Sequence, residues 1–363
     1  MKRIIPLLMI CGLLLSCMAD ADMAYRIGLK KLPSGGETRI GMQSILGLTP
    51  IKAVAEETAV PAVPEPPAEC TLTAPSIVKS LVESTSLEFA YAKGDYFYHL
   101  TLPDGEGYYH IHRYDKALTA LGLDLEIDMS ATHPLDPCWF GATSSRYYVA
   151  AVGNRVWGDP PALQVVSEIR IYRDDGSLYS QFGKKEYQDM WGGGYLKFTI
   201  DEDGDRIYIL HQSEKKLYST NLNGSDGCEG CLHGVSIADM SGYDTEIYYY
   251  LGTLYIWDYY NQMVYIHDPS DGSRIGSFSV ATEGDGDYDY MGCVVANGMI
   301  FISRDHEYDP PYEIKVFDLT GTYLGCIEMD TDNGPGYLEA SADYVYNFSS
   351  GIAEAYDVLG FGE

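Results

Sequence analysis

The stretch LYIWDYYNQMVYIHDPSDG, residues 254–272, contains the pattern that decides the fold. Two short segments, 254–257 and 263–266, are rich in aromatic and β-branched residues and are separated by a polar turn sequence. The pair Asp271-Gly272 follows, and this dipeptide supplies the positive φ values that a tight hairpin turn requires. A further strand-like segment, 274–278, comes directly after it. The stretch therefore predicts consecutive antiparallel strands joined by short turns.

The same pattern recurs along the chain. Aromatic or β-branched triplets stand 51, 60, 47, 46 and 44 residues apart, at 96–98, 147–149, 207–209, 254–256, 300–302 and 344–346. The turn glycines step by 48, 48 and 49 residues, at Gly176, Gly224, Gly272 and Gly321. A period of about 45 residues with several short strands is typical of one propeller blade. The sequence therefore predicts an all-β, six-bladed β-propeller over residues 76–363.

The last predicted unit stops too early to hold its outermost strand. Residues 76–82, SIVKSLV, have the composition of a strand and no other partner in the repeat. A propeller avoids long exposed sheet edges when its ring is closed. We therefore expect this N-terminal strand to complete the last blade.

Residues 254–268, followed by Asp271-Gly272, resemble the NHL-type propeller repeat, in which one strand ends in Asp-x-x-Asn and the next ends in Asp before a glycine turn. Residues 314–324 match the second half of that repeat, and the other units share its strand and turn pattern. Over residues 86–363 the chain is similar to the NHL/TolB-like six-bladed propeller lipoproteins of bacteria. The resemblance implies a scaffold for binding and names no ligand.

The first residues have the features of an export signal. Lys2 and Arg3 precede an apolar run over 4–15, which is too short to cross a hydrocarbon core of about 30 Å. The segment Leu-Leu-Ser-Cys ending at Cys17 resembles the lipobox of bacterial lipoproteins, which implies lipidation of Cys17. We predict a signal peptide over 1–16 and a lipid-anchored protein of the bacterial cell envelope. Cleavage a few residues later, giving a secreted protein, is the alternative.

Residues 17–75 predict a tether between the anchor and the propeller. Pro61, Pro64, Pro66 and Pro67 remove backbone donors and keep this part of the chain extended. The tether is therefore expected to act as a semi-rigid spacer.

The charge balance limits the class of partner. The chain has 24 Lys and Arg against 53 Asp and Glu, a formal net charge of −29. A nucleic-acid partner is excluded on this ground, because a phosphate backbone must be met by a basic surface. We expect a monomer that contacts the membrane only through its lipid anchor.

Candidate binding residues lie in long connections on one end of the propeller. If strands a to d run from the inside of each blade outward, the Asp-Gly turns join c to d, and the b–c and d–a connections share the opposite end. Long loops on a rigid scaffold are common binding sites. The predicted binding residues there are Trp157, Tyr187, Trp191, Asp305, His306 and Asp309. Such an aromatic and acidic rim suits a protein or glycan partner. Covering blade edges is the plainer role for each tryptophan.

Asp285, Asp287 and Asp289 are candidate calcium ligands. Carboxylates at alternate positions of a turning loop direct hard oxygen ligands at one cation. The segment lacks the twelve-residue frame of an EF-hand, and a solvated loop is the alternative reading.

Enzymatic motifs are missing from the sequence. It contains no Gly-x-Ser-x-Gly elbow, no phosphate-binding glycine loop and no His-Glu-x-x-His. His110 and His112 alternate on one predicted strand and share a face, so they offer two metal ligands or are ordinary half-exposed histidines. The predicted function is a binding module. The alternative is a metal-dependent, lactonase-like hydrolase or lyase with its site in the central channel, as in some six-bladed propellers.

Six cysteines remain outside the signal segment, and an export route permits disulfides among them. Cys228 and Cys231 form the single close pair. No second ligand pair at zinc-site spacing accompanies them, so we predict a local disulfide.

Overall fold

The computed structural model describes residues 79–82, 87–101, 108–128, 136–157, 162–187, 196–224, 230–242, 245–280, 288–306, 312–329, 334–349 and 352–358. Every regular element in these ranges is a β-strand. Among these residues there is no helix long and apolar enough to cross a membrane.

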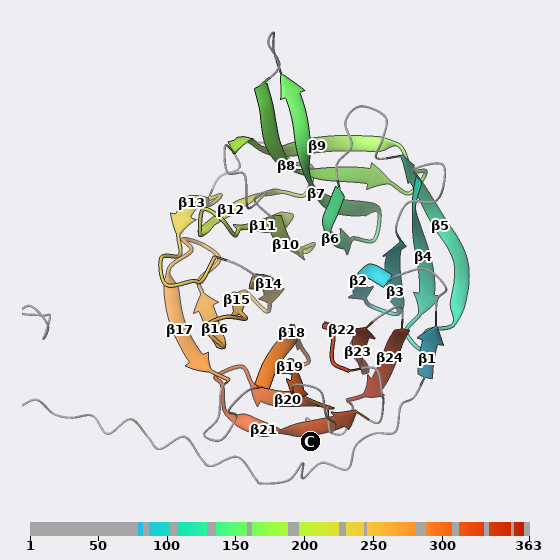
Figure 1. Cartoon of the computed structure of the whole chain (residues 1–363), viewed down its shortest axis with the longest axis vertical. Coiled ribbons are helices and arrows are strands. Elements are labelled where there is room, and N and C mark those ends of the chain that lie inside the picture. The colour runs from blue at the N-terminus through green and yellow to red at the C-terminus, as the bar shows by residue number, and fades with distance from the viewer. Residues whose placement is uncertain are drawn as a thin grey trace, which may run out of the picture. The chain divides into compact units, whose positions relative to one another are not determined.

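The strands form six four-stranded antiparallel sheets arranged around one axis (Figure 1). The innermost strands are β2 (Leu87–Lys93), β6 (Asp136–Ala142), β10 (Leu196–Asp201), β14 (Thr245–Tyr250), β18 (Tyr288–Ala296) and β22 (Tyr337–Ala340). The second strands are β3 (Tyr96–Thr101), β7 (Arg146–Trp157), β11 (Arg206–His211), β15 (Thr253–Asp258), β19 (Met299–His306) and β23 (Tyr344–Ser349). The third strands are β4 (Tyr108–Asp115), β8 (Ala162–Arg173), β12 (Lys216–Asn221), β16 (Met263–His267), β20 (Tyr312–Asp318) and β24 (Ile352–Asp357). The outermost strands are β5 (Ala120–Asp128), β9 (Leu178–Tyr187), β13 (His233–Ser236), β17 (Arg274–Ser279), β21 (Tyr323–Met329) and β1 (Lys79–Val82).

The sheets close into a ring. Each innermost strand contacts the innermost strand of the next sheet, and β22 contacts β2 to complete the circle. The predicted all-β, six-bladed propeller is therefore confirmed. The predicted strand order is also correct, because the turns at Gly176, Gly224, Gly272 and Gly321 all join a third strand to a fourth and all have positive φ.

The N-terminal strand closes the last sheet, as the sequence predicts. β1 pairs antiparallel with β24, with Lys79 opposite Ala355 and Val82 opposite Ile352. The outer edge of the C-terminal hairpin is thereby hydrogen-bonded to a strand from the other end of the repeat. Ring closure thus depends on contacts between residues more than 250 positions apart.

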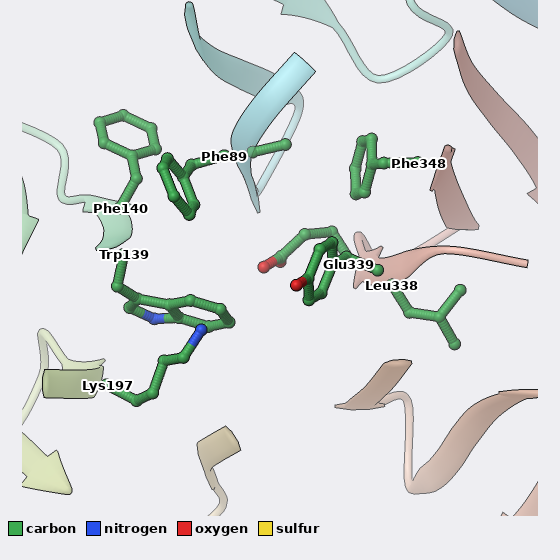
Figure 2. Close-up of a pocket in the computed structure, with 9 residues that line it drawn as sticks. Phe89, Trp139, Phe140, Lys197, Leu338, Glu339 and Phe348 are labelled. Atoms are coloured by element: carbon green, nitrogen blue, oxygen red, sulfur yellow. The ribbon is translucent and has the colours of Figure 1, made fainter. Parts of the chain in front are cut away.

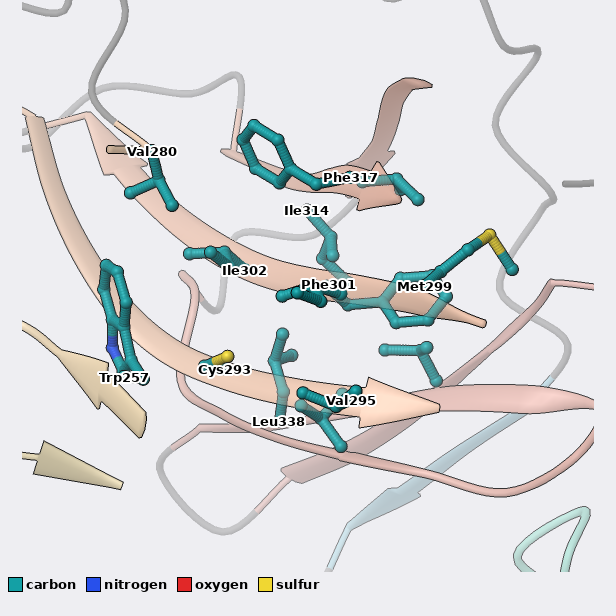
Figure 3. Close-up of a cluster of buried hydrophobic side chains, with 14 of the residues drawn as sticks. Trp257, Val280, Cys293, Val295, Met299, Phe301, Ile302, Ile314, Phe317 and Leu338 are labelled. Atoms are coloured by element: carbon teal, nitrogen blue, oxygen red, sulfur yellow. The ribbon is translucent and has the colours of Figure 1, made fainter. Parts of the chain in front are cut away.

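Adjacent residues of one strand face different neighbouring sheets. In β15, Leu254 and Ile256 belong to the apolar cluster shared with β11, whereas Tyr255 and Trp257 belong to the cluster shared with β19. All four are at most 4% exposed. Figure 3 shows the second cluster around Trp257. Because both faces of a blade are covered, its strands read as continuous apolar runs rather than as alternating ones.

One predicted long connection is largely a hairpin. β7 and β8 stay in register as far as Trp157 opposite Ala162, so only residues 158–161 join them. This hairpin projects from the ring (Figure 1). The expectation that Trp157 lies in a long connection between the second and third strands of its blade is therefore wrong. Two paired strands can extend beyond the apolar core, because each additional pair of opposite residues satisfies backbone N–H and C=O groups through hydrogen bonds between the strands.

Candidate functional site

A small cavity lies at the axis, where the innermost strands converge. Its volume is about 30 Å³, and its walls are Phe89, Ala90, Trp139, Phe140, Lys197, Tyr337, Leu338, Glu339 and Phe348. These residues come from β2, β6, β10, β22 and β23. Four of them, Phe89, Lys197, Tyr337 and Leu338, lie in the first half of an innermost strand, on the side where the d–a connections enter. These four residues are on the side of the ring that the sequence predicts to carry the binding loops.

Aromatic side chains leave little open space at this point. The cavity has room for about two or three water molecules, on the scale of about 10–15 Å³ for each. Phe140, Leu338 and Phe348 are buried, Phe89 and Trp139 are half-buried, and Tyr337 is 56% exposed. Tyr337 thus presents its ring to solvent at the mouth of the cavity.

Lys197 places a positive charge against this aromatic wall. Its Nζ lies 3.9 Å from the ring centroid of Trp139 and 6.0 Å from that of Tyr337. The indole Nε1 of Trp139 donates a hydrogen bond to the carbonyl oxygen of Phe198 at 2.9 Å, which fixes the plane of the ring. An ammonium group over an aromatic face is stabilised by the quadrupole of the ring. Figure 2 shows the Lys197 side chain reaching the indole.

Glu339 is the acidic group of the cavity wall. Its side chain points toward the space between Phe89 and Trp139 (Figure 2). Its Oε2 accepts a hydrogen bond from the backbone N–H of Ala92 at 3.3 Å, which links the last sheet to the first. Burial raises the pKa of Glu339 well above its ordinary value, and the nearby charge of Glu246 adds to that effect. Both effects favour the protonated form of the Glu339 carboxyl group.

A second buried carboxyl group lies near Glu339. Glu246 on β14 accepts hydrogen bonds from the hydroxyl of Tyr248 at 2.8 Å and from the backbone N–H of Cys293 at 3.2 Å. The Tyr248 hydroxyl also contacts the carbonyl oxygen of Cys293. Burial, and then the charge of Glu246, raise the pKa of Tyr248 well above its ordinary value. These contacts join β14 to β18 in the same way that Glu339 joins β22 to β2.

Two cysteines on innermost strands are free thiols. Cys138 and Cys293 are both buried. Burial raises the pKa of Cys138 to about 11 and that of Cys293 well above its ordinary value. Both thiols are therefore protonated and unreactive at neutral pH. Cys231 and Cys326 each take part in a disulfide bond. Cys228, the predicted partner of Cys231, lies outside the described residues.

Five predicted site residues lie at strand ends rather than in loops. Trp157 ends β7, Tyr187 ends β9 opposite Val165, Asp289 is opposite Asp305 across β18 and β19, and His306 ends β19 opposite Tyr288. The loop assignment of these residues is wrong, because the ladders extend further than the apolar pattern. Their side chains lie outside what the structure describes. Trp191, Asp309, Asp285, Asp287 and Cys17 lie wholly outside the described residues.

The predicted binding residues belong to two separate parts of the ring. Trp157 and Tyr187 belong to the β6–β9 sheet, whereas Asp305 and His306 belong to the β18–β21 sheet. These sheets are three positions apart in a ring of six, so they face each other across the axis (Figure 1). The backbone brings Asp289 and Asp305 together, but it separates both from the aromatic pair.

Sequence reasoning missed the residues that line the axial cavity. One signal was available for Glu339, because an acid inside the short strand Tyr337–Ala340 breaks its apolar pattern. Trp139 and Lys197 carry no such signal. Their proximity depends on the packing of β6 against β10, which a linear pattern does not show.

A metal ion at the axis has no ligand set in the described part of the chain. Among those residues, no three His, Cys, Asp or Glu side chains are placed to hold a metal ion. The axial carboxyl groups of Glu246 and Glu339 instead accept backbone hydrogen bonds. No chemical step is assigned to a metal here.

Solved structures resemble this chain in fold but share little of its sequence. Virginiamycin B lyase from Staphylococcus aureus matches with 8% identity and a TM-score of 0.49, over 77% of this chain and 99% of the lyase. Sqt1 from Saccharomyces cerevisiae matches with 10% identity and a TM-score of 0.45, over 79% and 100% of the two chains. BamB from Moraxella catarrhalis matches with 9% identity and a TM-score of 0.42, over 80% and 100%. No family model and no curated protein matches the chain. At these identities the likeness extends to the propeller fold alone.

Proposed function

We propose that this chain is an exported, lipid-anchored binding module that presents one end of its propeller to a protein or glycan partner in the bacterial cell envelope. The observation that carries the proposal is the aromatic axial cavity. Its 30 Å³ of space is too small to enclose a substrate, whereas ligand pockets enclose about 300–1,000 Å³. The aromatic residues that line the cavity are therefore better suited to contact the surface of a partner than to enclose a small substrate.

The residues at the mouth fit an interface centre. Tyr337 and Trp139 are the residue types that dominate binding energy at protein interfaces, since each has a large apolar surface and a polar group. Lys197 adds a cation held against Trp139, which gives a partner with a carboxylate an ion-pairing group. The predicted acidic and aromatic residues, Trp157, Tyr187, Trp191, Asp305, His306 and Asp309, would surround this centre as a rim.

Binding to glycan arrays and to cross-linked envelope fractions tests the proposal. Tyr337→Ala and Trp139→Ala are each expected to weaken binding by about tenfold or more, the loss typical of an interface anchor. Tyr260→Ala is the matched control, because Tyr260 is 61% exposed and does not line the cavity. Equal binding by all three variants would place the partner elsewhere. Glycan and protein partners are separated by whether the array or the cross-linked fraction gives the signal.

The second candidate function, a hydrolase or lyase at the axis, has one supporting observation. Glu339 lines the cavity, and burial raises the pKa of its carboxyl group, which favours the protonated form that a general acid needs. Screening the purified chain against lactone and glycoside substrates tests this candidate. Turnover that Glu339→Gln abolishes would favour the enzyme over the binding module.

A further inference from the structure

Three histidines lie on one face of the β3–β4 hairpin. His99 on β3 is directly opposite His112 on β4, and His110, two residues before His112, points to the same face. The ring centroids of His99 and His112 are 6.0 Å apart, and those of His110 and His112 are 6.3 Å apart. The pairing of two adjacent strands thus brings together three imidazole rings, of which the sequence pattern showed two.

His99 has an unusual environment among the buried histidines of the described chain. It is fully buried, and both its Nδ1 and its Nε2 lack a hydrogen-bond partner. The buried His211 and His267 each use Nδ1, in contacts with the backbone N–H of Glu214 and the carbonyl oxygen of Gly272. Buried polar atoms normally have partners, and an exception requires an explanation. The orphaned nitrogens of His99 point to a ligand that the protein alone does not supply.

A carboxylate lies beside the histidines. Glu126 on β5 is directly opposite His110 on β4, so the two side chains share the histidine face of the sheet. Glu126 is exposed, and His110 and His112 are half-buried. The group therefore has one end fixed in the core at His99 and an open end through which an ion can enter.

We propose that His99, His110 and His112, with Glu126 as fourth donor, bind a divalent transition-metal ion of the zinc type. Imidazole nitrogen and carboxylate oxygen are ligands that zinc prefers, and four protein ligands are typical of a structural site. The site would stabilise the first blade, whose β3 also packs against the last sheet through the stacked rings of Phe97 and Phe348.

Metal binding requires a local rearrangement of the rings. No described group of three such side chains already converges on one point. Zinc–nitrogen bonds of about 2.0–2.1 Å place two ligand nitrogens of a tetrahedral ion about 3.4 Å apart. Rotation of the half-buried His110 and His112 side chains would bring their nitrogens toward His99, which the core holds in place.

Zinc titration of the full chain, stripped with a chelator, tests the proposal. Calorimetry is expected to show one Zn²⁺ bound per chain, and excess Zn²⁺ is expected to raise the melting temperature by about 3 °C or more. Co²⁺ in place of Zn²⁺ should give the visible absorption of a four-coordinate ion. An unchanged melting temperature together with the absence of a binding isotherm would overturn the proposal.

Variants locate the ion. His112→Gln is expected to weaken Zn²⁺ binding by about 100-fold, whereas His233→Gln, at an exposed histidine outside the group, is expected to leave it unchanged. Circular dichroism without metal checks that His112→Gln is folded. If that variant does not fold, Glu126→Gln on the exposed side of the site provides the same comparison. Retained Zn²⁺ affinity in the folded variant would show that the ion binds elsewhere and would overturn the assignment.

Discussion

A Cβ atom at Gly321 would lie 2.3 Å from the ring of Phe278. Gly321 has a φ of +92° in the turn between β20 and β21, and Phe278 lies on β17 of the preceding sheet. The turn of one blade therefore packs directly on the outer strand of the blade before it. Gly224, in the turn after β12, is placed in the same way against Phe182 on β9 of its own preceding sheet, with 2.2 Å between the added Cβ and the ring.

Gly321→Ala is expected to lower the free energy of unfolding by about 2–4 kcal/mol. The left-handed backbone conformation accounts for about 1 kcal/mol of this loss, and the clash with Phe278 for the remaining 1–3 kcal/mol. Gly252→Ala is the control, because Gly252 also has a positive φ of +79° but nothing lies within 4 Å of its added Cβ. Denaturant unfolding measures both variants. Equal losses would mean that the contact with Phe278 has no energetic role.

Removal of residues 1–85 is expected to unfold or aggregate the propeller. This deletion removes β1 and leaves β24 as an unpaired edge strand, which is prone to pair with another molecule. A chain that begins at Ser76 keeps β1 and serves as the control. Light scattering and thermal unfolding distinguish the two proteins, and a stable, monomeric chain beginning at residue 86 would contradict the closure argument.

Glu339→Gln is expected to remove a pH dependence of stability. The folded pKa of Glu339 lies above its ordinary value of 4.5, so the wild-type protein loses stability as the pH rises from there toward the folded pKa. The loss is about 1.4 kcal/mol for each pH unit between the two pKa values. Glutamine has no proton to release and keeps an oxygen for the Ala92 N–H. Unfolding at about pH 4 should therefore give similar stabilities, and at about pH 8 the variant should be the more stable protein; parallel curves for both would contradict the assignment.

Cys17→Ser is expected to release the protein from the membrane fraction. The lipobox resemblance implies that Cys17 carries the lipid, and serine accepts no thioether-linked group. Fractionation with a lipid-analogue label on the wild-type chain measures the change. Cys11→Ser, inside the signal segment, is the control. Equal membrane association of both variants would favour an ordinary secretory signal or another anchor.

Calcium binding at Asp285, Asp287 and Asp289 stays a prediction, because the first two lie outside the described residues. Addition of excess Ca²⁺ is expected to raise the melting temperature of the wild-type chain by mass action. Asp287→Asn is expected to reduce that rise. A melting temperature that does not respond to millimolar Ca²⁺ would identify the segment as a solvated loop.

The first blade shows where the turn pattern fails. Its turn between β4 and β5 has no glycine, and Leu118 takes the left-handed conformation there with a φ of +59°. Leu118 is 1% exposed and packs in the cluster that contains Tyr346 of the last sheet. The Asp115 side chain accepts hydrogen bonds from the backbone N–H groups of Ala117 and Thr119 and so supports the turn. Burial against a sheet that is distant in sequence but adjacent in the ring stabilises a backbone conformation that leucine by itself disfavours.

The candidate site shows a similar limit. The sequence places Trp157 and Asp305 in long connections, yet the structure places them at or next to the ends of strands, in sheets on opposite sides of the axis. Trp139 and Lys197 are 58 residues apart in the sequence and come together only because β6 packs against β10.

The sequence by itself determined the blades, their number and their internal strand order, because strand periodicity and turn chemistry act between residues that are close along the chain. It also indicated which strand completes the last sheet. Only the tertiary structure decided which side chains meet at the axis and on the histidine face of β3 and β4. Those contacts arise from the closure of the ring and from the register of paired strands, and neither leaves a local signal in the order of the residues.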